Sequence, residues 1–354
     1  MRYLIDLPKN VIEEMRKILN EKDYNNINDF ILTAIENQIS LESSEMIDED
    51  LFSSTVRIPK SSKKIIKEEK KIDFSNLLKV NITKDIKILP TPKEKELKLE
   101  GIDYANDWLW GQVNRIFPIK VALRVLLKMQ NDCSDYINLN EFLKEAPQVA
   151  KDFGKELAKI DDEKSRKRGE RVSIALPIGE HEDKAISRYK NHFLAFIRHK
   201  DNALDGALAR LKFINMKKIS ENDFLIGLTK EGLEFAKLNN PIIDDNLYSN
   251  VTLSKEEKLF YLNHIKKNVP EELNPVKTII NLISIGYTEV KKMDNEIMKI
   301  KTNWTEKTVI TYRAGALGRL LELGLVEKTK KGVNVTYKIS KNVSEFNFTG
   351  GNNE

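Results

Sequence analysis

The chain has 354 residues, of which 40% are hydrophobic and 32% charged, a balance typical of globular proteins with many solvated side chains. This length exceeds the usual size of one domain, so we expect two to four domains. No apolar run reaches the roughly 18 residues of a membrane-spanning helix, and the single cysteine, Cys133, excludes an internal disulfide framework.

The charge and the first residues indicate where the protein works. The start, MRYLIDLPKN, lacks the long apolar segment of a signal peptide, so we expect a cytoplasmic, nucleoid-associated protein with no membrane partner. The net charge of +5 permits a polyanionic partner without requiring one.

The common motifs of catalytic and metal sites are missing. The sequence has no GxxxxGK(S/T) phosphate loop, no GxGxxG after a strand and no HExxH. Its histidines, His181, His192, His199 and His264, are scattered without a second type of ligand at metal-binding spacing. We therefore predict no catalytic residue, no metal and no cofactor, and interpret the protein as a binding protein rather than an enzyme.

A strand and two helices are predicted in the first forty residues. Residues 2–7 alternate, so Tyr3, Ile5 and Leu7 share one face of a strand that Pro8 ends. A helical period follows from Val11, and after a polar break a second helix is expected. A lone strand leaves its hydrogen-bonding groups unpaired, which a second copy of the chain would correct.

This pattern resembles a ribbon-helix-helix domain, which we place at residues 1–42. The resemblance implies a homodimer joined through Tyr3, Ile5 and Leu7, with DNA contacts from Arg2 on the ribbon and from the helix start at Asn28. An outward carboxylate at Asp6 would repel phosphates, so dimerisation is the firmer expectation and base recognition by the ribbon is left open.

Residues 43–100 change in composition and are expected to form a charged linker. High charge and short apolar islands cannot bury enough surface to fold alone, although residues 72–88 could dock as strands or a short helix.

Aromatic density rises near residue 103, and residues 101–250 are predicted to form a first winged-helix-like domain. Its helices are expected from Pro118 and from Leu139 to Leu157. A basic loop follows around Gly169. It is interpreted as a phosphate grip or, alternatively, a mobile loop, and its basic residues are Lys164, Arg166, Lys167, Arg168 and Arg171.

Residues 203–237 again give a helix followed by a hairpin. When Arg210 is laid over Arg319, Asn215 falls on Gly324, which predicts Asn215 as the left-handed end of the first helix. The outward face of that helix is poorly equipped to recognise bases, so a structural role is expected. The sequence NNPIIDD at residues 239–245 is expected to form a hinge.

Residues 251–341 are predicted to form a second winged-helix domain, which opens with a capping box at Ser254 and Glu257. A last helix is expected from the cap at Thr305 to Gly324. Its core stripe is predicted to be Ile310, Ala314, Leu317 and Leu321. A hairpin follows, and the lysines at its tip are expected to hold the DNA backbone: Lys328, Lys330 and Lys331.

The opposite face of this last helix carries hydroxyls, a phenol and a guanidinium, at Thr308, Thr311, Tyr312 and Arg319. The order of helix, glycine stop and basic hairpin resembles the end of prokaryotic and archaeal winged-helix regulators. The resemblance implies that this face enters the major groove of duplex DNA.

The sequence thus predicts a mainly helical fold with minor β-structure: a ribbon-helix-helix, a charged linker, two tandem winged-helix domains and a disordered tail at 342–354. The expected function is that of a dimeric, double-stranded DNA-binding transcriptional regulator or nucleoid-associated factor. A replication initiator or partition protein of a plasmid or mobile element is one alternative. A protein-interaction scaffold built of winged-helix modules is another.

Overall fold

The computed structural model describes residues 76–92, 108–109, 111–179, 182–220, 223–331 and 334–341. The contacts divide the chain into two compact units, Met1–Lys71 and Ile72–Glu354, and every described residue belongs to the second. The predicted ribbon-helix-helix lies outside the described residues, with its site residues Arg2, Tyr3, Ile5, Leu7 and Asn28. The predicted tail lies outside them as well.

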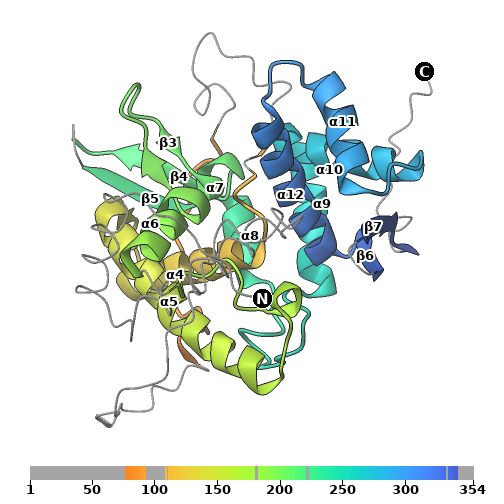
Figure 1. The fold of residues 1–354 in the computed structure, drawn as a ribbon. Helices are drawn as coiled ribbons and strands as arrows, with labels where there is room; N and C mark the ends of the chain where they lie inside the picture. The colour runs from red at the N-terminus through yellow and green to blue at the C-terminus, as the bar shows by residue number, and fades with distance from the viewer. Residues whose placement is uncertain are drawn as a thin grey trace, which may run out of the picture. The chain divides into compact units, whose positions relative to one another are not determined.

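The described unit is mainly helical with small antiparallel sheets, as predicted (Figure 1). We call residues 117–238 the first module. Its helices are α4 (Phe117–Cys133), α5 (Leu139–Glu163), α6 (Glu182–Phe193), α7 (Ala207–Arg210) and α8 (Lys230–Lys237), with a 3-10 turn at Arg168–Glu170. Its strands are β1 (Ile137–Asn138), β2 (Phe196–Ile197), β3 (Leu204–Asp205), β4 (Ile214–Lys218) and β5 (Phe224–Leu228).

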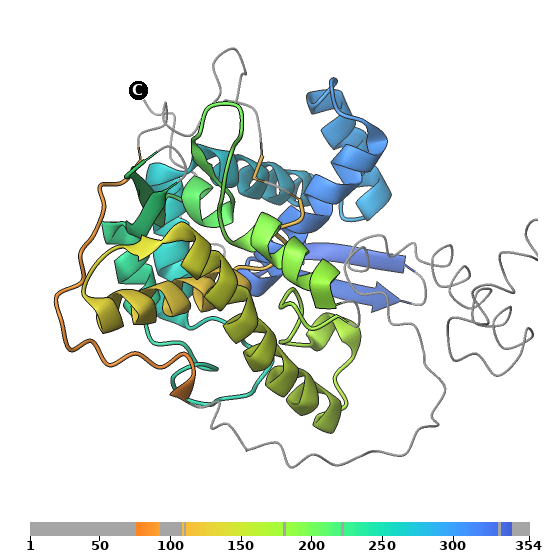
Figure 2. The same ribbon diagram turned by 90° about the vertical axis from the view of Figure 1, so that its left-hand side faces the viewer.

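We call residues 253–341 the second module. Its helices are α9 (Lys255–Asn268), α10 (Pro270–Ser284), α11 (Val290–Ile300) and α12 (Glu306–Leu323). Its strands are β6 (Val326–Lys331) and β7 (Asn334–Ile339), which form a two-stranded arm (Figure 2). The predicted capping box opens α9, since the Ser254 hydroxyl accepts from the Glu257 amide and the Glu257 carboxylate accepts from the Ser254 amide. None of the helices in the described ranges has the length and apolarity that crossing a bilayer requires.

The two modules repeat one strand arrangement. In the first, β5 lies between β4 and the short β1 that precedes α5. In the second, β7 pairs with β6, and Thr336 of β7 also bridges to Glu289, just before α11. Each hairpin is therefore extended by a short stretch of chain that lies between two earlier helices.

The junction of helix and hairpin is also repeated, with an offset different from the predicted one. Gly324 ends α12 in the left-handed conformation at φ 73°, and its counterpart after α7 is Lys212 at φ 56°. The next amide donates back to the helix in both modules, from Phe213 to the Leu208 carbonyl and from Leu325 to the Leu320 carbonyl, each at 3.0 Å. Asn215 lies inside β4, so its prediction as the helix end was wrong by three residues.

Residues 76–92, inside the predicted linker, lie against the first module in an extended conformation. The Leu89 amide donates to Leu228 of β5 at 2.9 Å, and the Gln130 side chain of α4 donates to the Lys87 carbonyl at 2.8 Å. Leu78 and Leu89 are buried. Docking of this region, which the sequence analysis allowed, thus holds for residues 76–92.

The connector between the modules, residues 239–252, includes the predicted hinge at 239–245 and is packed into the core. Asn240, Ile242 and Ile243 are buried, and the Asn240 side chain donates to the Thr252 carbonyl and to the Glu257 carboxylate. A buried amide with its hydrogen bonds satisfied resists opening.

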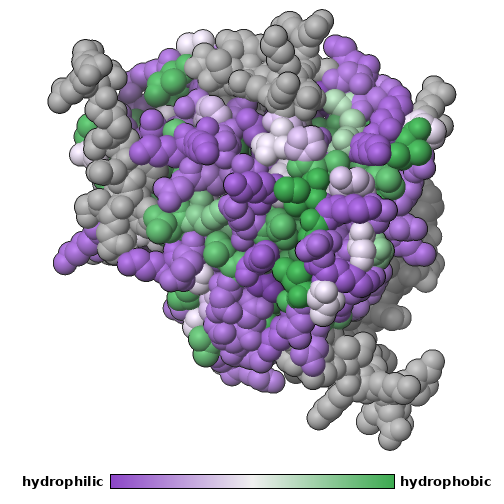
Figure 3. Space-filling model, turned by 180° about the vertical axis from the view of Figure 1, so that it is seen from behind, coloured by the Kyte–Doolittle hydropathy of each residue, from purple (hydrophilic) through white to green (hydrophobic). Residues whose placement is uncertain are grey.

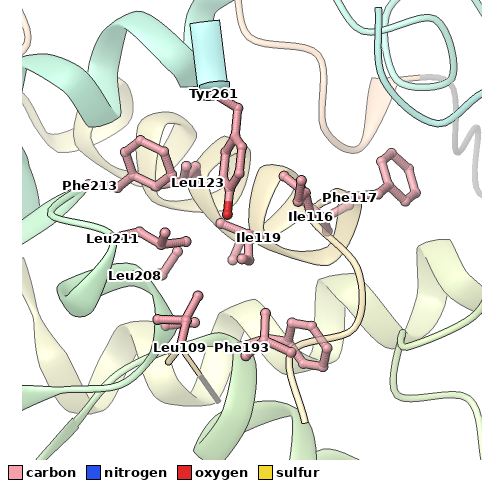
Figure 4. Packing of buried hydrophobic residues seen from close by; sticks show 14 of the residues in the cluster. Leu109, Ile116, Phe117, Ile119, Leu123, Phe193, Leu208, Leu211, Phe213 and Tyr261 are labelled. Carbon is pink, nitrogen blue, oxygen red and sulfur yellow. The ribbon is translucent and has the colours of Figure 1, made fainter. Parts of the chain in front are cut away.

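The hydrophobic core continues from one module into the other (Figure 4). Tyr261 of α9 points toward Ile119 of α4, and its ring is fully buried. Lys120, also on α4, forms an ion pair with Glu257 of α9 at 2.8 Å, with neither side chain exposed. Burial lowers the pKa of Lys120 to about 8. The joint between α4 and α9 is therefore both apolar and charged.

Candidate nucleic-acid interface

The interface is built around α12, which begins and ends where the sequence predicted. Thr305 caps it, with its hydroxyl accepting from the Thr308 amide at 3.2 Å, and Gly324 closes it. The turn from α11 to α12 spans residues 301–305. Trp304 in that turn packs against Tyr312, with ring centroids 4.6 Å apart, and against Trp108 at 5.6 Å. These contacts fix the direction in which α12 leaves the turn.

The buried side of α12 differs from the predicted stripe. The side chains in the core are Val309, Ala316, Leu317, Leu320 and Leu323. Of the predicted stripe only Leu317 is buried, while Ile310, Ala314 and Leu321 remain half-buried. Apolar residues lie on two sides of this helix, so their spacing alone did not identify which side faces the core.

The core side also includes two arginines whose charges are paired. Arg313 binds Asp294 of α11 through two hydrogen bonds of 2.8 and 3.1 Å. Arg319 binds Glu272 of α10 in the same bidentate manner at 2.6 and 2.7 Å, and it also donates to the Val113 carbonyl. Burial raises the pKa of Glu272, and Arg319 opposes that rise.

The prediction that Arg319 contacts DNA was therefore wrong. Its relative exposure is only 1%, so the guanidinium cannot reach a solvent-side ligand. A buried carboxylate on a neighbouring helix allows a charged residue to occupy a core position, and the sequence gives no direct sign of this pairing.

Residues 111–116, which we call the crossing segment, run along the outer side of α12. Gly111 lies against the backbone of Thr311 and Gly315, leaving no space for a Cβ atom. One helical turn further on, a Cβ atom on Gly318 would stand 2.5 Å from the carbonyl oxygen of Asn114. The two glycines inside α12 thus serve close backbone approach, a use for which glycine is suited despite its cost in a helix.

Glu322 attaches the end of the crossing segment to α12. Its carboxylate accepts from the backbone amides of Ile116 and Phe117, the latter at 3.3 Å, and from the Thr252 hydroxyl at 2.7 Å. α4 begins at Phe117 without a side-chain cap of its own. Glu322 therefore serves as a distant cap, with its negative charge at the positive end of the α4 dipole.

Three of the predicted recognition residues are partly accessible. Thr308 and Thr311 are half-buried near the start of α12, and the Thr311 hydroxyl donates to the Lys307 carbonyl at 2.8 Å. Tyr312 is half-buried and engaged by Trp304. Lys307, which the sequence analysis passed over, directly precedes Thr308 and is exposed.

The hairpin presents lysines on β6, where Lys328 is paired with Tyr337 and Lys330 with Val335 of β7. Lys328 and Lys330 are exposed on β6, whereas the side chain of Lys331 lies outside the described part. Lys338, across from Glu327, forms an exposed ion pair with it at 2.8 Å. Pairs of this kind in water are weak, so Lys338 is also available to an anion.

The basic loop of the first module is a structured turn around the carboxylate of Asp161. This buried side chain accepts from Arg166 at 2.8 Å and from the amides of Val172 and Ser173 at 3.1 and 3.0 Å. Arg166 and Lys164 also donate to the Tyr248 carbonyl of the connector.

These bonds correct the phosphate-grip prediction for part of the loop. Arg166 is committed to Asp161 and the connector, Lys164 also contacts the connector, and Arg171 forms an ion pair with Asp162. Lys167 is exposed and Arg168 half-buried. The loop therefore fastens the connector, and its role toward DNA stays a prediction only for Lys167 and Arg168.

Helix α11 adds basic residues that the sequence analysis missed. Lys291, Lys292 and Lys299 are exposed, and Lys292 and Lys299 form surface ion pairs with Glu289 and Glu296 at 2.7 and 2.6 Å. Lys292 and Lys299 follow Lys291 by one and eight residues, a spacing that places all three on one side of a helix. This spacing was the signal available in the sequence.

Positive charge is concentrated in the second module. Residues 253–341 contain seventeen Lys and Arg against ten Asp and Glu, so their formal charge of +7 exceeds the +5 of the whole chain. Two of the basic side chains, Arg313 and Arg319, are buried in ion pairs with two of the acidic ones, so the excess lies outside those pairs. Figure 3 shows the molecule from behind, and the coloured residues on that face are mostly hydrophilic, with hydrophobic residues between them.

Comparison with known proteins gives no relative from which to transfer a function. No protein-family model matches the chain, and neither a curated protein nor a solved structure matches it.

Proposed function

We propose that the protein binds duplex DNA through its second module and acts as a dimeric transcriptional regulator or nucleoid-associated factor. The observation that carries the proposal is an arrangement of elements on the most basic part of the chain. Helix α10, the bridge at Glu289, α11, α12 and the β6–β7 hairpin follow one another in the order of a winged helix. Winged helices also contact proteins, so the order of elements alone does not indicate DNA as the partner. The positive charge and the surface residues of the second module favour DNA.

In this proposal the first two turns of α12 enter the major groove. Lys307, Thr308 and Thr311 supply donors to base edges, and Ile310 and Ala314 offer apolar surface to thymine methyl groups. The later turns are occupied by the crossing segment, so recognition is expected to depend on the start of the helix.

The lysines of the hairpin and of α11 lie on either side of α12 in the chain and are assigned to phosphates. An ammonium group binds phosphate as a point charge without distinguishing bases, so these residues are expected to give affinity rather than specificity. Dimerisation through the predicted ribbon would place two such modules on one duplex and raise avidity.

The test is competition binding of the full chain to a duplex selected from random sequence. Replacing Lys330 and Lys331 by alanine is expected to weaken matched and shuffled duplexes about equally. The slope of log affinity against log salt should fall by about 0.9 per lost phosphate contact. Replacing Lys144 and Lys155, two exposed lysines on α5, is the matched control and should change neither quantity.

A second variant tests base recognition by α12. Thr308→Ala with Thr311→Ala is expected to reduce the preference for the matched duplex by about 1–3 kcal/mol per lost base contact. Absence of any duplex binding by the wild-type chain at low salt would reject the proposal. An unchanged preference in the threonine variant would reject α12 as the recognition helix.

A scaffold function is the second candidate, because one strip of α12 is apolar and half-buried: Ile310, Ala314 and Leu321. Such a strip fits a partner protein as well as thymine methyl groups. Ala314→Arg separates the two, since an added cation would strengthen contact with DNA and disrupt an apolar protein contact. A replication or partition role predicts selected sites that recur as repeats beside an origin or centromere.

A further inference from the structure

The crossing segment lies on the side of α12 that a recognition helix turns toward DNA. At about 100° per residue, Thr311, Gly315 and Gly318 are roughly opposite the core residues Val309 and Leu320. The backbone of residues 111–114 contacts the first three of these positions. A duplex that meets the start of α12 would therefore meet this segment next.

The polar residues of the segment are the ones left accessible. Val113 and Ile116 have no exposed surface, whereas Gln112, Asn114 and Arg115 are half-buried. Arg115 has no carboxylate partner among the residues that the structure describes, unlike the buried pairs of Arg313 and Arg319 nearby. The Asn114 Oδ1 atom is buried and lacks a hydrogen-bond partner within the same described part.

An arginine beside α12 without a carboxylate partner suits an anionic ligand. Its planar guanidinium can donate two parallel hydrogen bonds to a phosphate group. The position of the segment is rigid, because Glu322 holds the amides of Ile116 and Phe117 and Arg319 holds the Val113 carbonyl. Little backbone entropy would therefore be lost when Arg115 binds, and the cost is confined to its side chain.

We infer that the crossing segment forms a second DNA contact beside α12, in which Arg115 binds a backbone phosphate and Gln112 faces the adjoining sugar or base edge. This inference rests on the proposed function of the second module. It makes the DNA-binding surface composite, because the contact comes from residues that precede the first module in the chain.

The experiment compares Arg115→Ala, Arg115→Lys and the control Lys144→Ala in the full chain, using the duplex selected with the wild-type protein. Arg115→Ala should bind about tenfold more weakly at moderate salt and lower the salt slope by about 0.9, the value for one phosphate. Arg115→Lys should restore the slope, because a cation is kept, while Lys144→Ala should behave as wild type. Thermal unfolding is followed in parallel, and Arg115→Ala is expected to keep the wild-type midpoint.

Two results would overturn the inference. One is a wild-type salt slope in Arg115→Ala. The other is an equal loss of binding in Arg115→Ala and Lys144→Ala, which would indicate diffuse charge rather than a contact. In either case, weaker duplex binding by the variant that lacks Lys330 and Lys331 would still support the proposed function. A wild-type chain that binds no duplex would reject the proposed function itself, and the inference with it.

Discussion

The backbone of Gly111 lies directly against Gly315 in the middle of α12, so a Cβ atom on Gly315 would overlap the Gly111 carbonyl group. This contact joins the segment before the first module to the last helix of the second. It explains a glycine that the sequence alone would count as a defect, since glycine costs about 1 kcal/mol relative to alanine inside a helix.

Gly315→Ala should therefore destabilise the protein although it improves helix propensity. The overlap forces the crossing segment away, at a cost of about 1–3 kcal/mol for an overpacked site. Chemical denaturation of the full chain would measure the loss. Gly179→Ala is the control, because its added Cβ atom would make only an ordinary contact of 3.5 Å with Ala185. Equal stability of the two variants would contradict this packing.

Removal of the Glu322 carboxylate should affect the start of α4, although the two lie far apart in the sequence. Glu322→Ala leaves the amides of Ile116 and Phe117 and the Thr252 hydroxyl without their acceptor. Each buried group left unsatisfied costs about 1–3 kcal/mol. Glu322→Gln keeps one acceptor oxygen and should lose less. Amide hydrogen exchange should speed up at residues 116–117 in the alanine variant, and unchanged protection there would argue against the distant cap.

Arg319 is expected to matter for folding rather than for DNA contact. Arg319→Met leaves Glu272 as an unpaired buried carboxylate and should cost about 3–5 kcal/mol. The double variant Arg319→Met with Glu272→Met removes both charges and should be clearly more stable than the single variant. A double-mutant cycle by urea denaturation gives the coupling. Two losses that simply add would mean that the pair is not coupled.

The buried pair of Lys120 and Glu257 predicts a pH effect. The folded-state pKa of Lys120, about 8, lies below its ordinary value of 10.5. Between these values the unfolded chain keeps a proton that the folded chain has lost, so the free energy of unfolding should rise with pH through this window. Below pH 8 both states are protonated and the contribution of this group is constant.

The comparison variant is Lys120→Met with Glu257→Gln, which has no titratable group at this site. Its stability relative to wild type should fall as pH rises from about 8 to about 10, measured by urea denaturation at each pH. Parallel profiles for the two proteins would show that Lys120 does not titrate in this range.

Local sequence signals determined much of the second module. The hydroxyl cap at Thr305, the glycine stop at Gly324 and the capping box at Ser254 each act within a few residues, so the start of α9 and both ends of α12 follow from them. The basic hairpin after Gly324 was equally visible. The mainly helical class of the described unit followed from the helical spacing of apolar residues along the chain.

The tertiary structure decided which way α12 faces. Arg319 was expected outside because it lies opposite the predicted apolar stripe, but Glu272, forty-seven positions earlier in the chain, offsets the cost of its burial. Gly315 and Gly318 have a role in α12 only because the backbone of residues 111–114 lies against them. The predicted hinge is held by Asn240, which binds Glu257, and the predicted phosphate loop by Asp161, which binds Arg166 and the amide of Ser173. Caps and turns are read from neighbouring residues, whereas burial of a charge or a glycine depends on which distant segment arrives to pair with it.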